Sequence, residues 1–212
     1  MILLIDNYDS FSYNLYQLIG SCTDEDIKVI RNDELTVEEI DALDSSHIIL
    51  SPGPGRPSES GVCEEVALKL KSKVPILGIC LGHQGICEVH GAKVTYAKEL
   101  MHGKQSIITF DENEKIFKGL GKSYSEEQND KNKNNSNTQN ATNKIKIARY
   151  HSLAASEENF PEELKIIAKS DDGEIMAVKH KDYDLYGFQF HPESVLTEDG
   201  DIMMKNFLNI KK

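Results

Sequence analysis

The sequence lacks a long hydrophobic run. The opening apolar stretch, residues 1–5 (MILLI), is followed at once by Asp6. A bilayer-spanning helix needs about 20 apolar residues, and the apolar part of an export signal is also longer than this stretch. We therefore expect neither membrane attachment nor export, and the cytoplasm is the expected compartment.

Positive charge is also scarce. The 212 residues include 24 Lys and Arg against 35 Asp and Glu, which gives a formal net charge of −11. Proteins bind nucleic acids through clustered positive charge, so no nucleic-acid partner is expected. Residues 6–10 (DNYDS), which follow the first expected strand, contain no glycine-rich phosphate loop. Their composition argues against a nucleotide site.

The four cysteines include no C-x-x-C pair. Such usage is ordinary for a protein of a reducing compartment, and it does not indicate a zinc site. For Cys22, Cys63 and Cys87 we expect simple packing in the core. We predict no metal site and no cofactor in this chain.

Short apolar runs alternate with helical patterns through the first half of the chain. Such alternation predicts α/β architecture, a mostly parallel open sheet with helices on both faces. In the second half, short strands separated by turns predict antiparallel additions and a small side hairpin. The length suits a single domain over residues 1–212. The expected strands are 1–5, 27–31, 47–50, 75–79, 93–97, 106–110, 146–149, 165–169, 175–180 and 185–190, and the expected helices are 11–20, 36–43, 62–71, 82–90 and 201–209.

Residues 122–144 interrupt this pattern. They hold seven Asn with several Lys and Ser, and Tyr124 and Ala141 are their only apolar residues. A segment of this composition buries too little apolar surface to offset its ordering entropy. We therefore predict a disordered surface insertion between two strands, with no part in catalysis.

Residues 78–84 (GICLGHQ) carry the strongest chemical signal. They follow a buried-strand pattern and open a helical one, which places Cys80 at a sharp turn between Gly78 and Gly82. Glycine lacks a Cβ atom and so permits a tight turn and the close approach of a substrate. A thiol at a helix N-terminus meets unpaired N–H groups that favour the thiolate. The pattern indicates a nucleophile.

Residues 189–194 (QFHPES) offer the groups that such a nucleophile needs. They continue another strand-like run, which Pro192 ends. Residues two apart in an extended segment share a side, so Glu193 can hold and orient the ring of His191. A nucleophile, a base and an orienting group make a catalytic triad. The alternative interpretation is a packed core cysteine and a surface histidine.

A third segment, residues 51–55 (SPGPG), alternates residues that restrict and free the backbone. Taken alone, this pattern is typical of a plain turn. It follows the expected strand 47–50, however, and ligands in open α/β sheets bind beyond the carboxyl ends of the strands. At that position the segment can direct a backbone N–H at a developing oxyanion.

Together, the three segments resemble the signatures of class I (triad) glutamine amidotransferase domains. The likeness covers nearly the whole chain in order, and residues 121–144 depart from it. Within that family, the chain is similar to the glutaminase subunits of anthranilate synthase and of aminodeoxychorismate synthase. The narrower likeness rests on residues 6–15 (DNYDSFSYNL), 101–104 (MHGK), 149–153 (RYHSL) and 187–190 (GFQF).

The resemblance implies a flavodoxin-like class I glutaminase fold with free L-glutamine as the substrate. It implies that Cys80 is the nucleophile, that His191 moves the proton and that Glu193 orients the imidazole. The oxyanion is expected against the backbone N–H groups of Gly53 and Leu81. The residues expected to line the glutamine pocket are Gly53, Pro54, Gly55, Gln84, Ser152 and Leu153.

The resemblance also implies a hetero-oligomer with a large synthase subunit that binds chorismate and receives the ammonia. Anthranilate synthase, in tryptophan biosynthesis, is the expected assembly. The nearest alternative is aminodeoxychorismate synthase, in folate biosynthesis, or a subunit shared by both enzymes. Two further alternatives are a partner-independent thiol hydrolase of γ-glutamyl compounds and a non-catalytic subunit that senses glutamine.

Overall fold

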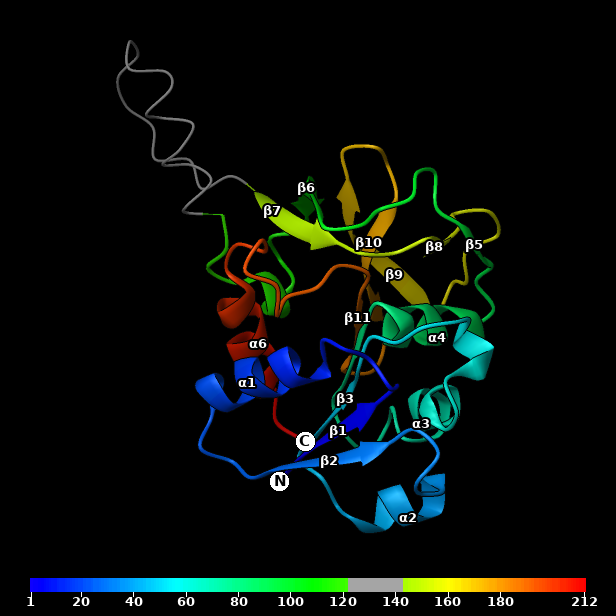
Figure 1. The fold of residues 1–212 in the computed structure, drawn as a ribbon, viewed down its shortest axis with the longest axis vertical. Helices are drawn as coiled ribbons and strands as arrows, with labels where there is room; N and C mark the ends of the chain where they lie inside the picture. Colours follow the sequence, from blue (N-terminus) through cyan, green and yellow to red (C-terminus); the bar gives the residue numbers. More distant parts are fainter. Residues whose placement is uncertain (122–142) are drawn as a thin grey trace.

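A nine-stranded sheet forms the middle layer of the protein (Figure 1). The computed structural model describes residues 1–121 and 143–212. From one edge to the other, the sheet contains β2 (Ile27–Arg31), β1 (Ile2–Asp6), β3 (His47–Leu50), β4 (Ile76–Ile79), β11 (Leu185–Phe188), β10 (Ile175–His180), β9 (Leu164–Ser170), β6 (Lys104–Phe110) and β7 (Lys144–Arg149).

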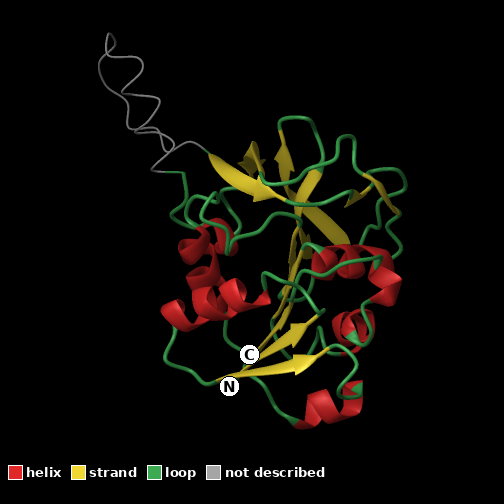
Figure 2. Ribbon diagram, in the orientation of Figure 1, coloured by secondary structure: helices red, strands yellow, loops and turns green. Residues whose placement is uncertain are grey.

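Helices cover both faces of the sheet (Figure 2). Helices α1 (Ser12–Cys22) and α6 (Gly200–Leu208) pack together on one face, with the short 3₁₀ helix η2 (Lys115–Phe117). Helices α2 (Val37–Ala42), α3 (Cys63–Lys69) and α4 (Leu81–Val89) form the other layer, with η1 (Pro57–Glu59) beside α4. The predicted arrangement of helices on both faces is confirmed.

The strand pairing changes from parallel to antiparallel at β11. Strands β2, β1, β3, β4 and β11 are parallel to one another, whereas β11, β10, β9, β6 and β7 pair antiparallel. A separate two-stranded sheet joins β5 (Val94–Tyr96) to β8 (Leu153–Ala155). The predicted antiparallel additions are confirmed. The predicted side hairpin is instead a pair of strands that are far apart in the sequence, and β8 was not predicted.

The burial of alternate residues of β1 on opposite faces explains why this strand reads as a continuous apolar run. Ile2 and Leu4 pack in the cluster that contains Leu15 of α1, whereas Leu3 and Ile5 pack in the cluster under the other helix layer. All four are fully buried. Burying each such side chain stabilises the fold by roughly 1.5–3 kcal/mol.

The bounds of the predicted elements differ from the observed ones by at most two residues, and two of these differences matter here. The strand expected over residues 185–190 ends at Phe188, two residues earlier. Of the predicted insertion, residues 122–142 lie outside the described residues, while Lys144 begins β7 and pairs with Thr109. The prediction was therefore wrong for Lys144, because strand pairing with β6 outweighs the polar character of the segment.

None of the helices in the described part of the chain has both the length and the hydropathy of a bilayer-spanning segment.

Candidate active site

Cys80 forms a strained elbow between β4 and α4. Its backbone has φ +50° and ψ −99°, a conformation that L-residues rarely adopt and that costs on the order of 1–3 kcal/mol. Two hydrogen bonds hold it: the Cys80 N–H donates to the Phe188 carbonyl at 2.7 Å, and the Gln84 N–H donates to the Cys80 carbonyl at 3.0 Å. The side chain therefore projects at the N-terminus of α4, as predicted.

The glycines around Cys80 have a different role from the one predicted. Only Cys80 itself has a positive φ at this turn. A Cβ at Gly78 would lie 2.5 Å from the Gly82 carbonyl oxygen, and one at Gly82 would lie 2.6 Å from the Leu50 carbonyl oxygen. The glycines thus allow α4 to pack directly on the backbone of β3 and β4, which fixes the position of the nucleophile.

The His191 ring lies between two partners. Its Nδ1 is 2.6 Å from Oε1 of Glu193, and the side chains of the two residues are 3% and 1% exposed. The other ring nitrogen, Nε2, is buried without a hydrogen-bond partner in the described residues, and Cys80 is close enough to influence the pKa of the ring. The ring also contacts Phe11 and Tyr150, whose ring centroids lie 5.8 and 5.0 Å away. The structure therefore brings the three predicted triad residues together.

The pKa of His191 reflects this position. Burial by itself lowers it, but the hydrogen bonds and charge interactions with Cys80 and Glu193 raise it to about 10. The two neighbours therefore stabilise the imidazolium form that the ring takes when it accepts a proton.

Strand pairing explains why residues 111 positions apart meet. β4 and β11 are parallel neighbours, with Ile79 opposite Phe188. Carboxyl ends of parallel neighbours lie at the same edge of a sheet, so Cys80 and the segment that starts at Gln189 leave the sheet side by side.

Asn7 positions the loop that carries Gly53. Its N–H donates to Oγ of Ser51 at 2.8 Å, and its side-chain amide donates to the Ser51 carbonyl at 2.8 Å. A Cβ at Gly53 would lie 2.5 Å from Cβ of Asn7 and 2.8 Å from Cδ2 of Leu81. Gly53 and Leu81 are therefore neighbours, as an oxyanion site requires.

The backbone N–H groups of these two neighbours are suited to binding an anion. The Gly53 N–H donates no hydrogen bond within residues 1–121 and 143–212. Leu81 is the first residue of α4, where backbone N–H groups have no partner inside the helix.

Of the residues expected to line the glutamine pocket, some are hydrogen-bonded to one another and others lie on exposed loops. The Gln84 amide donates to the Leu153 carbonyl at 2.9 Å, which joins α4 to β8. Pro54, Gly55 and Ser152 are exposed on loops after β3 and β7 and add no side chain to the buried triad. The backbone of Gly55 has φ +82°, which a glycine tolerates best.

Gln189 is a site residue to which the sequence analysis assigned no role. Its amide Nε2 donates to Sγ of Cys80 at 3.6 Å, and its Oε1 accepts from Nε2 of Gln84 at 3.1 Å. The side chain is fully buried. Its position directly after β11, level with Cys80, is the signal that could have identified it.

A buried network behind the pocket begins at Arg149. This side chain is fully buried and pairs with Asp172 at 2.8 Å and with Glu174. Its Nε–H donates to Nε2 of His151 at 3.1 Å, and Nδ1–H of His151 donates to the Leu153 carbonyl at 2.9 Å. The same carbonyl accepts from Gln84, so hydrogen bonds run without a break from Arg149 to the sulfur of Cys80.

Two ionisable groups of this network, His151 and Asp172, have strongly lowered pKa values. Burial, together with the Arg149 guanidinium, lowers the pKa of His151 to about 4, so its ring is neutral at physiological pH. Burial acts to raise the pKa of Asp172, but hydrogen bonds from Ser170 and Arg149 outweigh it and bring the pKa to about 2. His151 therefore anchors its loop in the neutral form.

Comparison with known proteins agrees with this geometry. The family model of class-I glutamine amidotransferases matches residues 3–210. Anthranilate synthase component 2 of Cyanophora paradoxa is 45% identical over 99% of this chain and 98% of its own length. Aminodeoxychorismate synthase component 2 of Escherichia coli is 42% identical over 99% of this chain and 100% of its own length.

Other relatives are much longer proteins. The bifunctional protein TrpGD of Thermotoga maritima is 46% identical, and this chain spans 32% of its length. The chain spans 24% of the multifunctional tryptophan biosynthesis protein of Phycomyces blakesleeanus, at 45% identity. Among solved structures, a GMP synthase subunit of Thermoplasma acidophilum matches with a TM-score of 0.76 and 26% identity, covering 98% of this chain and 91% of that one.

Proposed function

Because the chain belongs to the class-I glutamine amidotransferase family, we propose that it hydrolyses L-glutamine and supplies ammonia to a chorismate-using synthase. The observation that carries the proposal is the buried His191 imidazole, which interacts with Cys80 on one side and with Glu193 on the other. The steps below use only groups of this chain, and we assign no metal or cofactor to them.

In the first half of the reaction, His191 takes the thiol proton and the Cys80 sulfur attacks the side-chain carboxamide carbon. The charge that forms on the carboxamide oxygen is stabilised by the N–H groups of Gly53 and Leu81, and each such donor is worth about 2.7–4 kcal/mol. His191 then returns its proton to the leaving nitrogen. Ammonia departs and leaves a γ-glutamyl thioester on Cys80.

In the second half, His191 takes a proton from a water molecule, which attacks the thioester and releases glutamate. Glu193 holds Nδ1–H at 2.6 Å, so Nε2 is the nitrogen directed at the reacting atoms. The carboxylate also stabilises the imidazolium that forms twice in the cycle.

The contacts of Gln84 support its expected role in glutamine binding. Both amide hydrogens are used within the protein, on the carbonyl of Leu153 and on Oε1 of Gln189. Only the acceptor oxygen of Gln84 remains for the substrate, and the α-ammonium group of glutamine is the matching donor. Gly53, Pro54, Gly55, Ser152 and Leu153 complete the proposed pocket.

Exposed apolar side chains near the site support a partner subunit. Val195 is 99% exposed, directly after the triad segment, and Tyr13 and Leu100 are 75% and 71% exposed. A surface pocket of about 430 Å³ is lined by Phe11, Tyr150 and Glu193 among others. Aromatic and apolar residues are typical of the core of protein interfaces. We place the synthase subunit on this surface, in the cytoplasm.

We propose anthranilate synthase as the partner, since two full-length relatives are named as component 2 of that enzyme. Relatives of similar identity are named for aminodeoxychorismate synthase or, in Bacillus subtilis, for both enzymes. Co-purification with each large subunit, followed by assays of glutamine-dependent anthranilate and aminodeoxychorismate formation, separates the three assignments.

The glutaminase proposal is tested by trapping. A diazoketone analogue of glutamine is incubated with the purified chain, with and without the large subunit, and the modified peptide is identified by mass spectrometry. We expect modification of Cys80, faster with the partner and greatly slowed in His191→Asn. Modification of Cys22 or Cys87 instead, or none in any condition, would contradict the proposal.

A further inference from the structure

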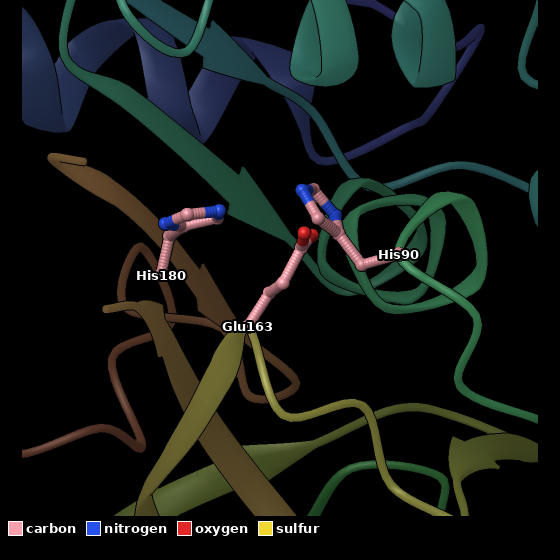
Figure 3. Close-up of side chains that lie close together, drawn as sticks. All are labelled: His90, Glu163 and His180. Atoms are coloured by element: carbon pink, nitrogen blue, oxygen red, sulfur yellow. The ribbon is translucent and has the colours of Figure 1, made fainter. Parts of the chain in front are cut away.

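A cluster of side chains of the kind that bind metal ions lies at the end of α4 opposite to Cys80. His90, Glu163 and His180 come from the C-cap of α4, the turn before β9 and the end of β10 (Figure 3). One ligand atom of each lies within 4.8 Å of those of the other two. The proposed reaction uses none of them. We propose that these three residues bind a divalent transition-metal ion of the zinc class.

The sheet holds two of the ligands in place. His180 pairs with Leu164 across β10 and β9, and the Lys181 N–H donates to the Glu163 carbonyl at 2.9 Å. Glu163 and His180 are therefore neighbours through strand register. In Figure 3 the Glu163 carboxylate lies between the two imidazole rings.

The His90 ring is already oriented as a ligand. Its Nδ1 lies 2.7 Å from the Ile86 carbonyl oxygen and donates its proton there, which leaves the Nε2 lone pair free to bind a cation. Metal-ligating histidines almost always donate their second ring nitrogen in this way, because that bond fixes the tautomer and the ring orientation.

His180 has an unsatisfied buried nitrogen. The residue is 2% exposed, and its Nε2 has no hydrogen-bond partner within the described residues. Its Nδ1 accepts from the Asp182 N–H at 3.1 Å. Metal binding through Nε2 moves the ring proton to Nδ1 and turns the Asp182 amide away, a change confined to the exposed turn after β10.

A cation already lies in the cluster. The Lys71 ammonium donates to Nε2 of His90 at 2.9 Å and lies 4.0 Å from Oε2 of Glu163, and its side chain is 15% exposed. The C-terminus of a helix favours positive charge. Two of the three proposed ligands thus already have a cation beside them, and the ammonium is the competitor that a metal ion must displace.

The donor set and its freedom to move fit zinc. Two imidazoles and one carboxylate, with a fourth position open to water, form a recurrent zinc site with metal–ligand distances of about 2.0–2.2 Å. The ligand atoms must draw closer than they are here. The Glu163 side chain is 64% exposed and free to close on the ion.

The test uses the purified full chain titrated with Co²⁺ as a spectroscopic probe and with Zn²⁺ as its competitor. We expect one tight site with the visible absorption bands of tetrahedral Co²⁺, lost on adding Zn²⁺. Zn²⁺ at a hundred times its Kd is expected to raise Tm by at least about 5 °C. The variant Lys71→Gln removes the competitor, and its affinity is expected to be at least about tenfold higher.

Matched variants decide the outcome. His90→Gln and His180→Gln are each expected to abolish the Co²⁺ bands, whereas His102→Gln, an exposed histidine outside the cluster, leaves them unchanged. Circular dichroism confirms that each variant is folded. The proposal is overturned if Lys71→Gln binds no metal, or if binding survives both cluster variants and disappears in Cys80→Ser.

Discussion

The two ends of helix α4 carry opposite chemistry. At the N-terminus, Cys80 meets unpaired backbone N–H groups, whereas at the C-terminus the Lys71 ammonium lies 2.9 Å from His90. The helix macrodipole favours an anion at the first end and a cation at the second. At 1.5 Å per residue, the nine residues of α4 separate the two ends by roughly 13 Å.

The two ends also differ in how tightly they are packed. Around Cys80, the glycines Gly78 and Gly82 touch backbone atoms and leave no room for a Cβ. After His90, a Cβ at Gly91 would meet nothing within 4 Å. Backbone strain and close packing therefore occur at the end that positions the nucleophile, and the other end keeps room for side chains to rearrange.

The largest effect is expected from the chemical groups at the N-terminal end. Cys80→Ser and His191→Asn are each expected to lower glutaminase activity with the partner subunit at least about 10⁴-fold, because triad members act as a unit. Cys87→Ala, two turns along the same helix, is the control. Burial strongly raises the pKa of the Cys87 thiol, so it is not a nucleophile. Loss of activity in a folded Cys87→Ala protein would contradict the comparison.

The next effect concerns packing at the same end. Gly82→Ala is expected to destabilise the fold by about 1–3 kcal/mol or more, because the new Cβ would meet the Leu50 carbonyl at 2.6 Å. Gly85→Ala is the matched control one turn later, where the nearest atom is Cγ of Glu64 at 3.4 Å. There the higher helix propensity of alanine, up to about 1 kcal/mol, offsets the mild crowding. Urea unfolding measures both, and equal stability losses would show that the elbow is not specially packed.

A smaller effect is expected at Gln189. Gln189→Leu removes the N–H that donates to Cys80 at 3.6 Å, so thiolate formation becomes less favourable. We expect kcat to fall about 10–100-fold, and the acid limb of the pH–rate profile to move to higher pH. Gln105→Ala, on the exposed side of β6, is the control. A loss of activity without a shift of that limb would indicate a purely structural role.

The smallest effect concerns two carboxyl groups between α3 and α4. Burial and the nearby Glu88 raise the pKa of Glu64 to about 7, well above its unfolded value near 4.5. The folded state therefore binds the extra proton, and stability falls as pH rises from about 4.5 through 7. Glu64→Gln is expected to remove this fall, which is on the order of 1 kcal/mol because solvent screens the half-buried group. Unfolding at pH 5 and pH 8 measures it, and an unchanged pH slope would contradict the assignment.

Local patterns in the sequence were sufficient to predict most elements of the fold. The helix expected from residue 36 is confirmed in α2, where Thr36 and Glu39 form a capping box whose two hydrogen bonds lie within four residues. Strand β8 escaped prediction because it has three residues and its strand partner, β5, lies far away in the sequence. The end of β11 was misplaced because Gln189 and Phe190 are buried like strand residues although they have left the ladder.

The residues of the candidate site likewise fall into those that the sequence predicted and those that it did not. Cys80, His191 and Glu193 were predicted because nucleophile, base and orienting group have recognisable neighbours in the sequence. Gln189 and Asn7 were missed, because their roles depend on partners 109 and 44 positions away. Amide side chains become significant only when a structure shows what they donate to.

The amino-acid sequence by itself determined the alternation of strands and helices, the helix start at Thr36 and the identity of the reactive groups, since each depends on residues that are close together in the chain. Only the tertiary structure decided that Cys80 bears the backbone strain, that Gln189 meets its sulfur, and that His90, Glu163 and His180 come together. The physical reason is that strand pairing and helix packing determine distances between remote residues, and no local pattern encodes those distances.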